Sequence, residues 1–134
     1  MKSRSEELFD SIKIFYDDPK NSQCLYDILE KKKNISLRNL EWFITDYSKS
    51  TNFTYKTSKG KSFIVHCEYK SSLDGYSKKL FDPFCRDDPK KSTKFEYTIP
   101  GTETTVLTTV AQLNFIRWCI KNNIIEQYEN LKTK

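Results

Sequence analysis

Hydrophobic positions in the first part of the chain recur at helical spacing. Leu8, Ile12 and Phe15 fall at i, i+4 and i+7, and the stripe stops before the sequence Asp-Asp-Pro at 17–19. Apolar residues within 25–29 indicate a short second helix that runs into a lysine cluster. These spacings predict that the chain begins with at least two helices.

A third helix is predicted to begin at Ser36, a residue type that caps helix N-termini well. Asn39 stands where the capping box usually has Glu. The apolar residues that follow share one face: Leu37, Leu40, Ile44 and Tyr47. At ~100° per residue, Trp42 projects away from that face.

The spacing of the hydrophobic positions then changes from helical to alternating. In residues 53–57 apolar and polar residues alternate, residues 58–61 are typical of a turn, and residues 62–68 have the strongest strand pattern in the chain. Together they predict a β-hairpin. A polar stretch follows, and residues 94–99 alternate again and predict a third strand that ends at Pro-Gly.

The last part of the chain is predicted to be helical. Thr108 or Thr109 can cap a helix over 110–120. Most of its circumference is apolar, and only one sector is consistently polar, made of Asn114, Arg117 and Lys121. A helix that is apolar on most sides belongs in the centre of the core. A final helix is predicted over 124–131.

These elements predict one α+β domain over residues 1–134, with helices packed on a small antiparallel sheet of about three strands. The predicted parts are a helical region (1–48), a hairpin, basic loop and third strand (49–99) and C-terminal helices (107–131).

Composition narrows the class of protein. With 37% hydrophobic and 31% charged residues, the chain is neither a membrane protein nor a disordered tail. No export signal is recognisable, and the four cysteines, at 24, 67, 85 and 119, include no close pair. We therefore expect free thiols in a reducing compartment, and neither a bound metal nor a cofactor.

Positive charge is concentrated in the middle of the chain. Residues 1–48 hold 8 basic and 9 acidic side chains, residues 49–94 hold 11 and 5, and residues 95–134 hold 4 and 4. The chain has 19 lysines and 4 arginines, which indicates an AT-rich genome. A codon bias acts on the whole gene, so it does not explain why the excess lies in one segment.

Aromatic residues alternate with these cations, a combination that suits a polyanion because ammonium groups displace counterions and rings stack on bases. The alternative is a solvated lysine face over a core that uses the same aromatics. The candidate phosphate contacts are Lys56, Lys59, Lys61, Lys70, Lys78, Lys79 and Arg86, with Tyr55 and Tyr76 as candidate stacking platforms.

Catalytic candidates are few. His66 and Cys67 are neighbours on the predicted strand and therefore point to opposite faces, which disfavours a shared site. Glu68 and Lys70 would share one face, and with Asp46 they resemble half of the E-x-K motif of Mg²⁺-dependent nucleases.

Two further side chains point to partners. Arg86 is one of four arginines, and we expect it to hold a carboxylate within the fold more readily than a phosphate. Trp42 and Trp118 are both expected in the core, and Trp42, if it is exposed instead, is the best single anchor for a protein partner.

Three segments carry a family resemblance: 34–49, 112–118 and, most specifically, Tyr76-Ser-Lys-Lys-Leu-Phe-Asp-Pro-Phe-Cys-Arg86. They resemble a family of short proteins of nucleocytoplasmic large DNA viruses, the giant viruses. That family has no settled activity, so no catalytic residues carry over. The resemblance implies a protein made in the host cytoplasm that acts in the viral factory or the virion.

Three functions follow as hypotheses. The first is a non-enzymatic viral accessory protein that binds DNA or RNA, without strong sequence preference, through the 49–94 segment. The second is an oligomeric interaction or assembly module whose basic face meets an acidic viral or host protein. The third is a metal-dependent nuclease at Glu68 and Lys70.

Overall fold

The computed structural model describes residues 4–30, 35–57, 59–76, 78–81 and 94–132. The helices and strands follow in chain order: α1 (Arg4–Tyr16), α2 (Pro19–Leu29), α3 (Leu37–Trp42), the π-helix η1 (Phe43–Tyr47), α4 (Ser48–Thr51), β1 (Thr54–Lys56), β2 (Ser62–Ile64), α5 (Val65–Tyr76), α6 (Lys78–Phe81), β3 (Phe95–Thr98), β4 (Thr105–Thr108), α7 (Val110–Lys121) and α8 (Ile124–Lys132). Helices and antiparallel strands together confirm the α+β class.

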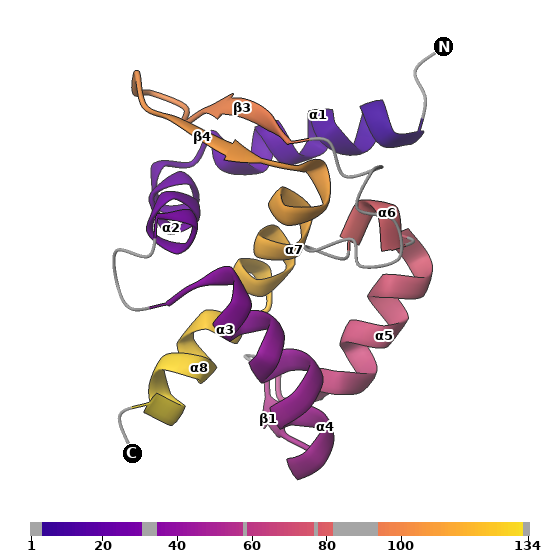
Figure 1. The fold of residues 1–134 in the computed structure, drawn as a ribbon. Helices are drawn as coiled ribbons and strands as arrows, with labels where there is room; N and C mark the ends of the chain where they lie inside the picture. The colour runs from indigo at the N-terminus through magenta and orange to yellow at the C-terminus, as the bar shows by residue number, and fades with distance from the viewer. Residues whose placement is uncertain (1–3, 31–34, 58, 77, 82–93, 133–134) are drawn as a thin grey trace.

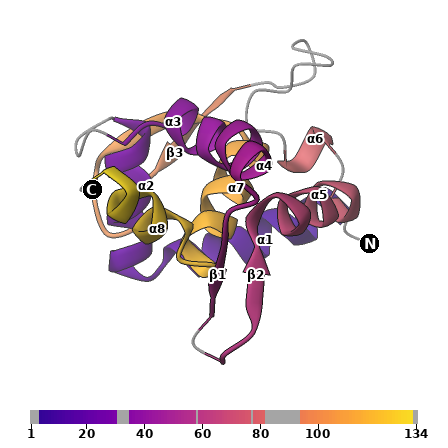
Figure 2. The same cartoon turned by 90° about the horizontal axis from the view of Figure 1, so that it is seen from below.

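Helix α7 runs through the middle of the molecule, and the other long helices surround it (Figures 1 and 2). Every residue from Ala111 to Cys119 is buried, which confirms the central position predicted for this helix. Thr109 caps it by accepting a hydrogen bond from the Gln112 backbone N–H at 3.1 Å. The helix ends before Asn123, whose φ of 58° lies in the left-handed region that Asn tolerates.

The two N-terminal helices pack on this core. Asp18 caps α2 by accepting a hydrogen bond from the Lys20 backbone N–H at 2.9 Å, so the second helix begins earlier than predicted. The Tyr16 hydroxyl donates to the Leu113 carbonyl at 2.7 Å and ties α1 to α7.

The predicted third helix begins after Ser36, which confirms the predicted N-cap. Asn39 takes the place of the usual Glu and completes a reciprocal capping box, which the sequence had not indicated. It continues through one π-helical stretch into α4 and ends at Asn52, which has a φ of 54°. Trp42 stands away from the buried face, as predicted, but 45% of its surface is exposed, so the expectation that it lies in the core is wrong.

Within the described residues the strands form two sheets, not one sheet of three strands. β1 pairs with β2, and β3 pairs with β4, each pair antiparallel. The predicted third strand is present as β3, but its partner is β4, a strand that the sequence did not reveal. In Figure 1 the β3–β4 pair and the β1 strand lie at opposite ends of the molecule, with α7 between them.

The strand predicted over 62–68 is wrong beyond Ile64, because α5 begins at Val65. Val65, Tyr69, Leu73 and Tyr76 recur at i, i+4, i+8 and i+11, a helical stripe that faces the core. The Tyr69 ring lies 5.5 Å from the ring of Phe81 and 6.0 Å from that of Trp118. Packing on this aromatic group therefore favours helix over the local β preference.

Candidate nucleic-acid interface

Strands β1 and β2 form a short hairpin with one face toward the protein and the other toward solvent. Tyr55 pairs with Phe63 on the inner face, and Lys56 pairs with Ser62 on the outer face. The turn is closed by the Thr57 N–H, which donates to the Lys61 carbonyl at 2.8 Å. Gly60 takes a φ of 79° there, which only glycine adopts without strain. Figure 2 shows the hairpin extending away from the helices.

The inner face of the hairpin is anchored by aromatic side chains. The Tyr55 and Phe63 rings lie 5.1 Å apart, and Phe63 lies 6.0 Å from Trp118 of α7. The Tyr55 hydroxyl donates to the Asn122 carbonyl at the end of α7. Burial, with smaller effects from Cys119 and Glu68, raises the pKa of Tyr55 to about 12, so its proton stays in place for this hydrogen bond.

Lysines occupy the rest of the hairpin, which we define as residues 54–64 and call the basic hairpin. Lys56, Lys59 and Lys61 are all exposed, and this segment contains no acidic residue. Within the described part of the chain none of the three lysines forms an ion pair. The charge of the hairpin is therefore open to a partner.

Two more lysines flank the ends of the basic hairpin. Lys49 lies on α4, just before β1, and Lys70 lies on α5, just after β2; both are exposed. Both are close enough to His66 to affect its imidazole: desolvation, then Lys70 and then Lys49 lower the pKa of His66. Residues 48–70 hold five lysines and one carboxylate, Glu68.

The remaining predicted phosphate contacts fall elsewhere. The side chains of Lys78 and Lys79, and all of Arg86, lie outside what the structure describes. Lys94 directly precedes β3, and β3 lies at the end of the molecule opposite β1 (Figure 1). The structure thus brings together the hairpin lysines with Lys49 and Lys70, but it separates Lys94 from them.

Neither predicted stacking platform presents a free ring. Tyr55 is partly buried in the aromatic packing beneath the hairpin. Tyr76 stacks on Phe81 with ring centroids 5.6 Å apart. Both side chains stabilise the fold, so we no longer assign them to base stacking.

The helix at α5 changes the interpretation of the catalytic candidates. Glu68 and Lys70 are two residues apart on a helix, so their side chains diverge by ~200° and do not share a face as they would on a strand. The half-motif of a nuclease is therefore not formed. His66 and Cys67 are adjacent on the same helix, and within the described residues no three potential ligands gather into a metal site.

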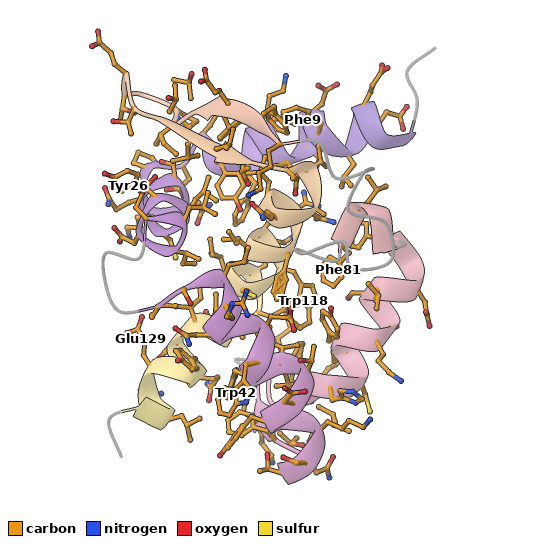
Figure 3. The ribbon with its side chains drawn as sticks, viewed as in Figure 1. Phe9, Tyr26, Trp42, Phe81, Trp118 and Glu129 are labelled. Atoms are coloured by element: carbon orange, nitrogen blue, oxygen red, sulfur yellow. The ribbon has the colours of Figure 1, made fainter. Side chains whose placement is uncertain are left out.

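Trp42 is an exposed aromatic side chain outside the basic hairpin. It lies on α3 with its ring 5.6 Å from that of Tyr47 (Figure 3). Trp118, in contrast, is buried between α7 and α6 beside Phe81, as predicted (Figure 3).

Sequence reasoning missed two features near the site. Lys49 belongs to the basic segment, but the sequence does not distinguish it there, because its position relative to the hairpin depends on how α4 ends. Asn114 and Arg117 form a polar sector of α7 in the sequence, and the structure buries both of them. The signal was present in the sequence, since polar residues on an otherwise apolar helix require partners.

Comparisons with known proteins identify a family and a viral relative. A family model described as a family of unknown function (DUF7197) matches residues 2–134. The chain is 40% identical over 122 residues to "Uncharacterized protein L507" of Acanthamoeba polyphaga mimivirus, an alignment that covers 87% of this chain and 46% of that protein. The chain thus spans about half the length of this curated relative. The resemblance to a giant-virus family is confirmed.

No solved structure matches the chain. Among the helices of the described residues, none is long and apolar enough to cross a membrane.

Proposed function

The chain belongs to a family of unknown function, DUF7197, and for this member we propose that the basic hairpin binds nucleic acid. The role is that of a non-enzymatic viral accessory protein. The observation that carries the proposal is the state of three side chains: Lys56, Lys59 and Lys61 are exposed on a projecting hairpin, without an ion pair in the described part of the chain.

Such a hairpin suits the phosphate backbone. Exposed ammonium groups that meet phosphates release condensed counterions, and this release favours binding at low salt. Lys49 and Lys70 extend the positive surface at the two ends of the hairpin. The rigid aromatic packing below holds the strands in place, so little conformational entropy is lost when the lysines engage a partner.

The same chemistry predicts weak sequence preference. Lysine acts as a point charge, whereas base readout commonly uses the bidentate fork of arginine or the amide of Asn or Gln. Residues 54–64 contain none of these three residue types. Binding should therefore depend on salt more than on sequence, with log Kd rising with log salt at a slope of ~3 when three lysines each contact one phosphate.

The test compares two charge reversals of equal size. Lys59→Glu with Lys61→Glu changes the formal net charge from +5 to +1, and so does Lys20→Glu with Lys94→Glu. All four lysines are exposed, so both variants should fold. We expect the hairpin variant to weaken binding to a labelled single-stranded or duplex oligonucleotide by about tenfold or more, and the control to weaken it much less.

Equal losses in the two variants would show that only net charge matters and would refute the hairpin as the interface. Unchanged binding of the hairpin variant would refute it too. Circular dichroism of both variants checks that the helices are intact.

Trp42 supports a second candidate function, recognition of a protein. It is a large aromatic side chain with 45% of its surface exposed, and residues of this type anchor many protein interfaces. An acidic viral or host protein could then meet Trp42 and the lysines together. Nuclease-resistant co-purification from infected cells that is lost in Trp42→Ala would favour this candidate over nucleic acid.

A further inference from the structure

Helix α7 carries a buried arginine at the centre of the molecule. Arg117 has only 7% of its surface exposed. One terminal nitrogen donates to Ser11 Oγ of α1 at 2.9 Å, and the other donates to Asn114 Oδ1 at 2.9 Å. Asn114 in turn donates from Nδ2 to the Leu80 carbonyl of α6, so the network links α1, α7 and α6.

The charge of this arginine is not balanced by the partners that the structure describes. Ser11 and Asn114 are neutral, and no ion pair of Arg117 is found in the described residues. The nearby Tyr16 is not an anion either, because burial, followed by the effects of Cys119 and Cys24, raises its pKa well above 10. A buried guanidinium without an anion is costly, and buried charges in proteins are normally paired.

A cavity of about 260 Å³ opens beside this arginine. Its lining consists of Tyr76, Asn114, Arg117, Trp118, Lys121 and Asn122. Lys121 adds a second cation, and among the residues that the structure describes no acidic side chain belongs to the lining. A guanidinium has five N–H donors, of which two are used by Ser11 and Asn114, so donors remain for a ligand.

We propose that this cavity binds a phosphate group, held by Arg117 and Lys121. A phosphate offers several acceptor oxygens and up to two negative charges, which match a site rich in donors and cations. The Tyr76 hydroxyl has no hydrogen bond in the described part of the chain and is a further donor at the cavity wall. Binding would supply the anion that Arg117 lacks among the described residues.

The cavity lies at the root of the basic hairpin. Asn122 lines it and also accepts the hydrogen bond from the Tyr55 hydroxyl of β1. The phosphate could therefore come from two sources: the backbone of a nucleic acid that also contacts the hairpin, or a free phosphate compound. The cavity can bind phosphate whether or not the hairpin binds nucleic acid.

The test uses inorganic phosphate. Titration at constant ionic strength, with chloride as the competing anion, is followed by the ¹H–¹⁵N NMR resonances of the Arg117 side chain and by the thermal midpoint. We expect saturable shifts at Arg117 and a higher midpoint in phosphate than in chloride. Lys121 is exposed, so the Lys121→Gln variant should fold normally. We expect it to bind phosphate about tenfold more weakly than the wild type. Lys20→Gln, an exposed lysine on α2, is the matched control and should leave binding unchanged.

Arg117→Lys retains the positive charge but loses the bidentate hydrogen-bonding geometry of the guanidinium. It should therefore weaken phosphate binding more than Lys121→Gln does. Because a substitution at the buried Arg117 can destabilise the fold, the comparison of Lys121→Gln with Lys20→Gln decides the outcome. The absence of any effect of phosphate beyond that of chloride refutes the proposal, and so does equal binding by Lys121→Gln and Lys20→Gln.

A final arm identifies the source of the phosphate. If Lys121→Gln also weakens oligonucleotide binding, the cavity takes a backbone phosphate. If it weakens only inorganic phosphate, the cavity serves a free phosphate compound. Loss of oligonucleotide binding in the hairpin variant, with phosphate binding retained, separates the two proposals from each other.

Discussion

The Tyr55 hydroxyl of β1 donates a hydrogen bond to the Asn122 carbonyl, 67 residues later in the chain. This bond satisfies a carbonyl at the C-terminal end of α7, where no helical partner exists. It also fixes the base of the basic hairpin against the central helix. The orientation of the hairpin therefore depends on one phenol together with the aromatic packing around it.

The first prediction removes this hydroxyl. Tyr55→Phe keeps the ring packing against Phe63 but leaves the Asn122 carbonyl without its donor. We expect a loss of ~1 kcal/mol in the free energy of unfolding, the usual net value of one hydrogen bond. Urea denaturation followed by circular dichroism measures it. Thr54→Ala, on the solvent face of the same strand, is the control and should change stability less. Equal stability of Tyr55→Phe and the wild type would contradict the role assigned to this bond.

The second prediction concerns alkaline pH. Burial is the largest cause of the raised pKa of four tyrosines: Tyr16, Tyr55, Tyr97 and Tyr128. In the unfolded chain they lose protons near pH 10, whereas in the folded chain they keep them. The unfolded state then binds fewer protons, so the free energy of unfolding should fall as the pH rises above 10.

Tyr55 gives this prediction a specific range, because its pKa is about 12 in the folded state. Its contribution should be lost between about pH 10 and 12, and Tyr55→Phe should show a shallower fall than the wild type in that range. Denaturation curves at pH 8, 9, 10 and 11 test it. If the free energy of unfolding of Tyr55→Phe fell with pH as steeply as that of the wild type, the raised pKa assigned to Tyr55 would be contradicted.

How far the sequence predicts this fold depends on how local the determining contacts are. The N-cap at Ser36, the turn at Gly60 and the central character of α7 all follow from short-range patterns, and all were predictable. The start of α5 at Val65 was not, because Phe63, Ile64 and Val65 favour strand locally. There the deciding partners are Phe81, Phe115 and Trp118, which are distant in sequence.

The same distinction between local and distant contacts decides which parts of the candidate site the sequence predicts. Exposed lysines on a hairpin can be predicted, because the alternation of residues 53–57 places Lys56 on the face opposite Tyr55. The buried state of Arg117 cannot, since it depends on Ser11 of α1 and Asn114 lying on either side of the guanidinium. No local pattern encodes a contact between residues 106 positions apart.

The third prediction contrasts the two tryptophans. Trp118→Ala should cost ~3–5 kcal/mol of stability, because the ring is buried against Phe63, Tyr69 and Phe81. Trp42→Ala should cost ~1 kcal/mol or less, because nearly half of its surface already faces solvent. Urea denaturation followed by far-UV circular dichroism compares the two. Similar losses in both variants would show that Trp42 is a core residue and would remove it as an anchor for partners.

The fourth prediction uses His66 as a reporter at the base of the basic hairpin. It is the only histidine, so its imidazole signals in ¹H NMR need no assignment. Its pKa should lie below 6.5, because desolvation, Lys70 and Lys49 all disfavour the charged form. Lys70→Gln and Lys49→Gln should each raise it, and the larger rise should come from Lys70. Lys20→Gln, on α2, should leave it unchanged.

A polyanion bound on the same surface should shift the pKa of His66 in the direction opposite to the shift that the lysines cause. Phosphates near Lys49 and Lys70 offset their positive charge and stabilise the imidazolium, so a bound oligonucleotide should raise the pKa of His66. The shift should disappear at high salt, when the nucleic acid dissociates. In the Lys59→Glu, Lys61→Glu variant the oligonucleotide should no longer move the titration curve. A pKa that is unchanged by a saturating oligonucleotide would place the nucleic acid away from α4 and α5, because charges within ~10 Å are incompletely screened at 0.1 M salt.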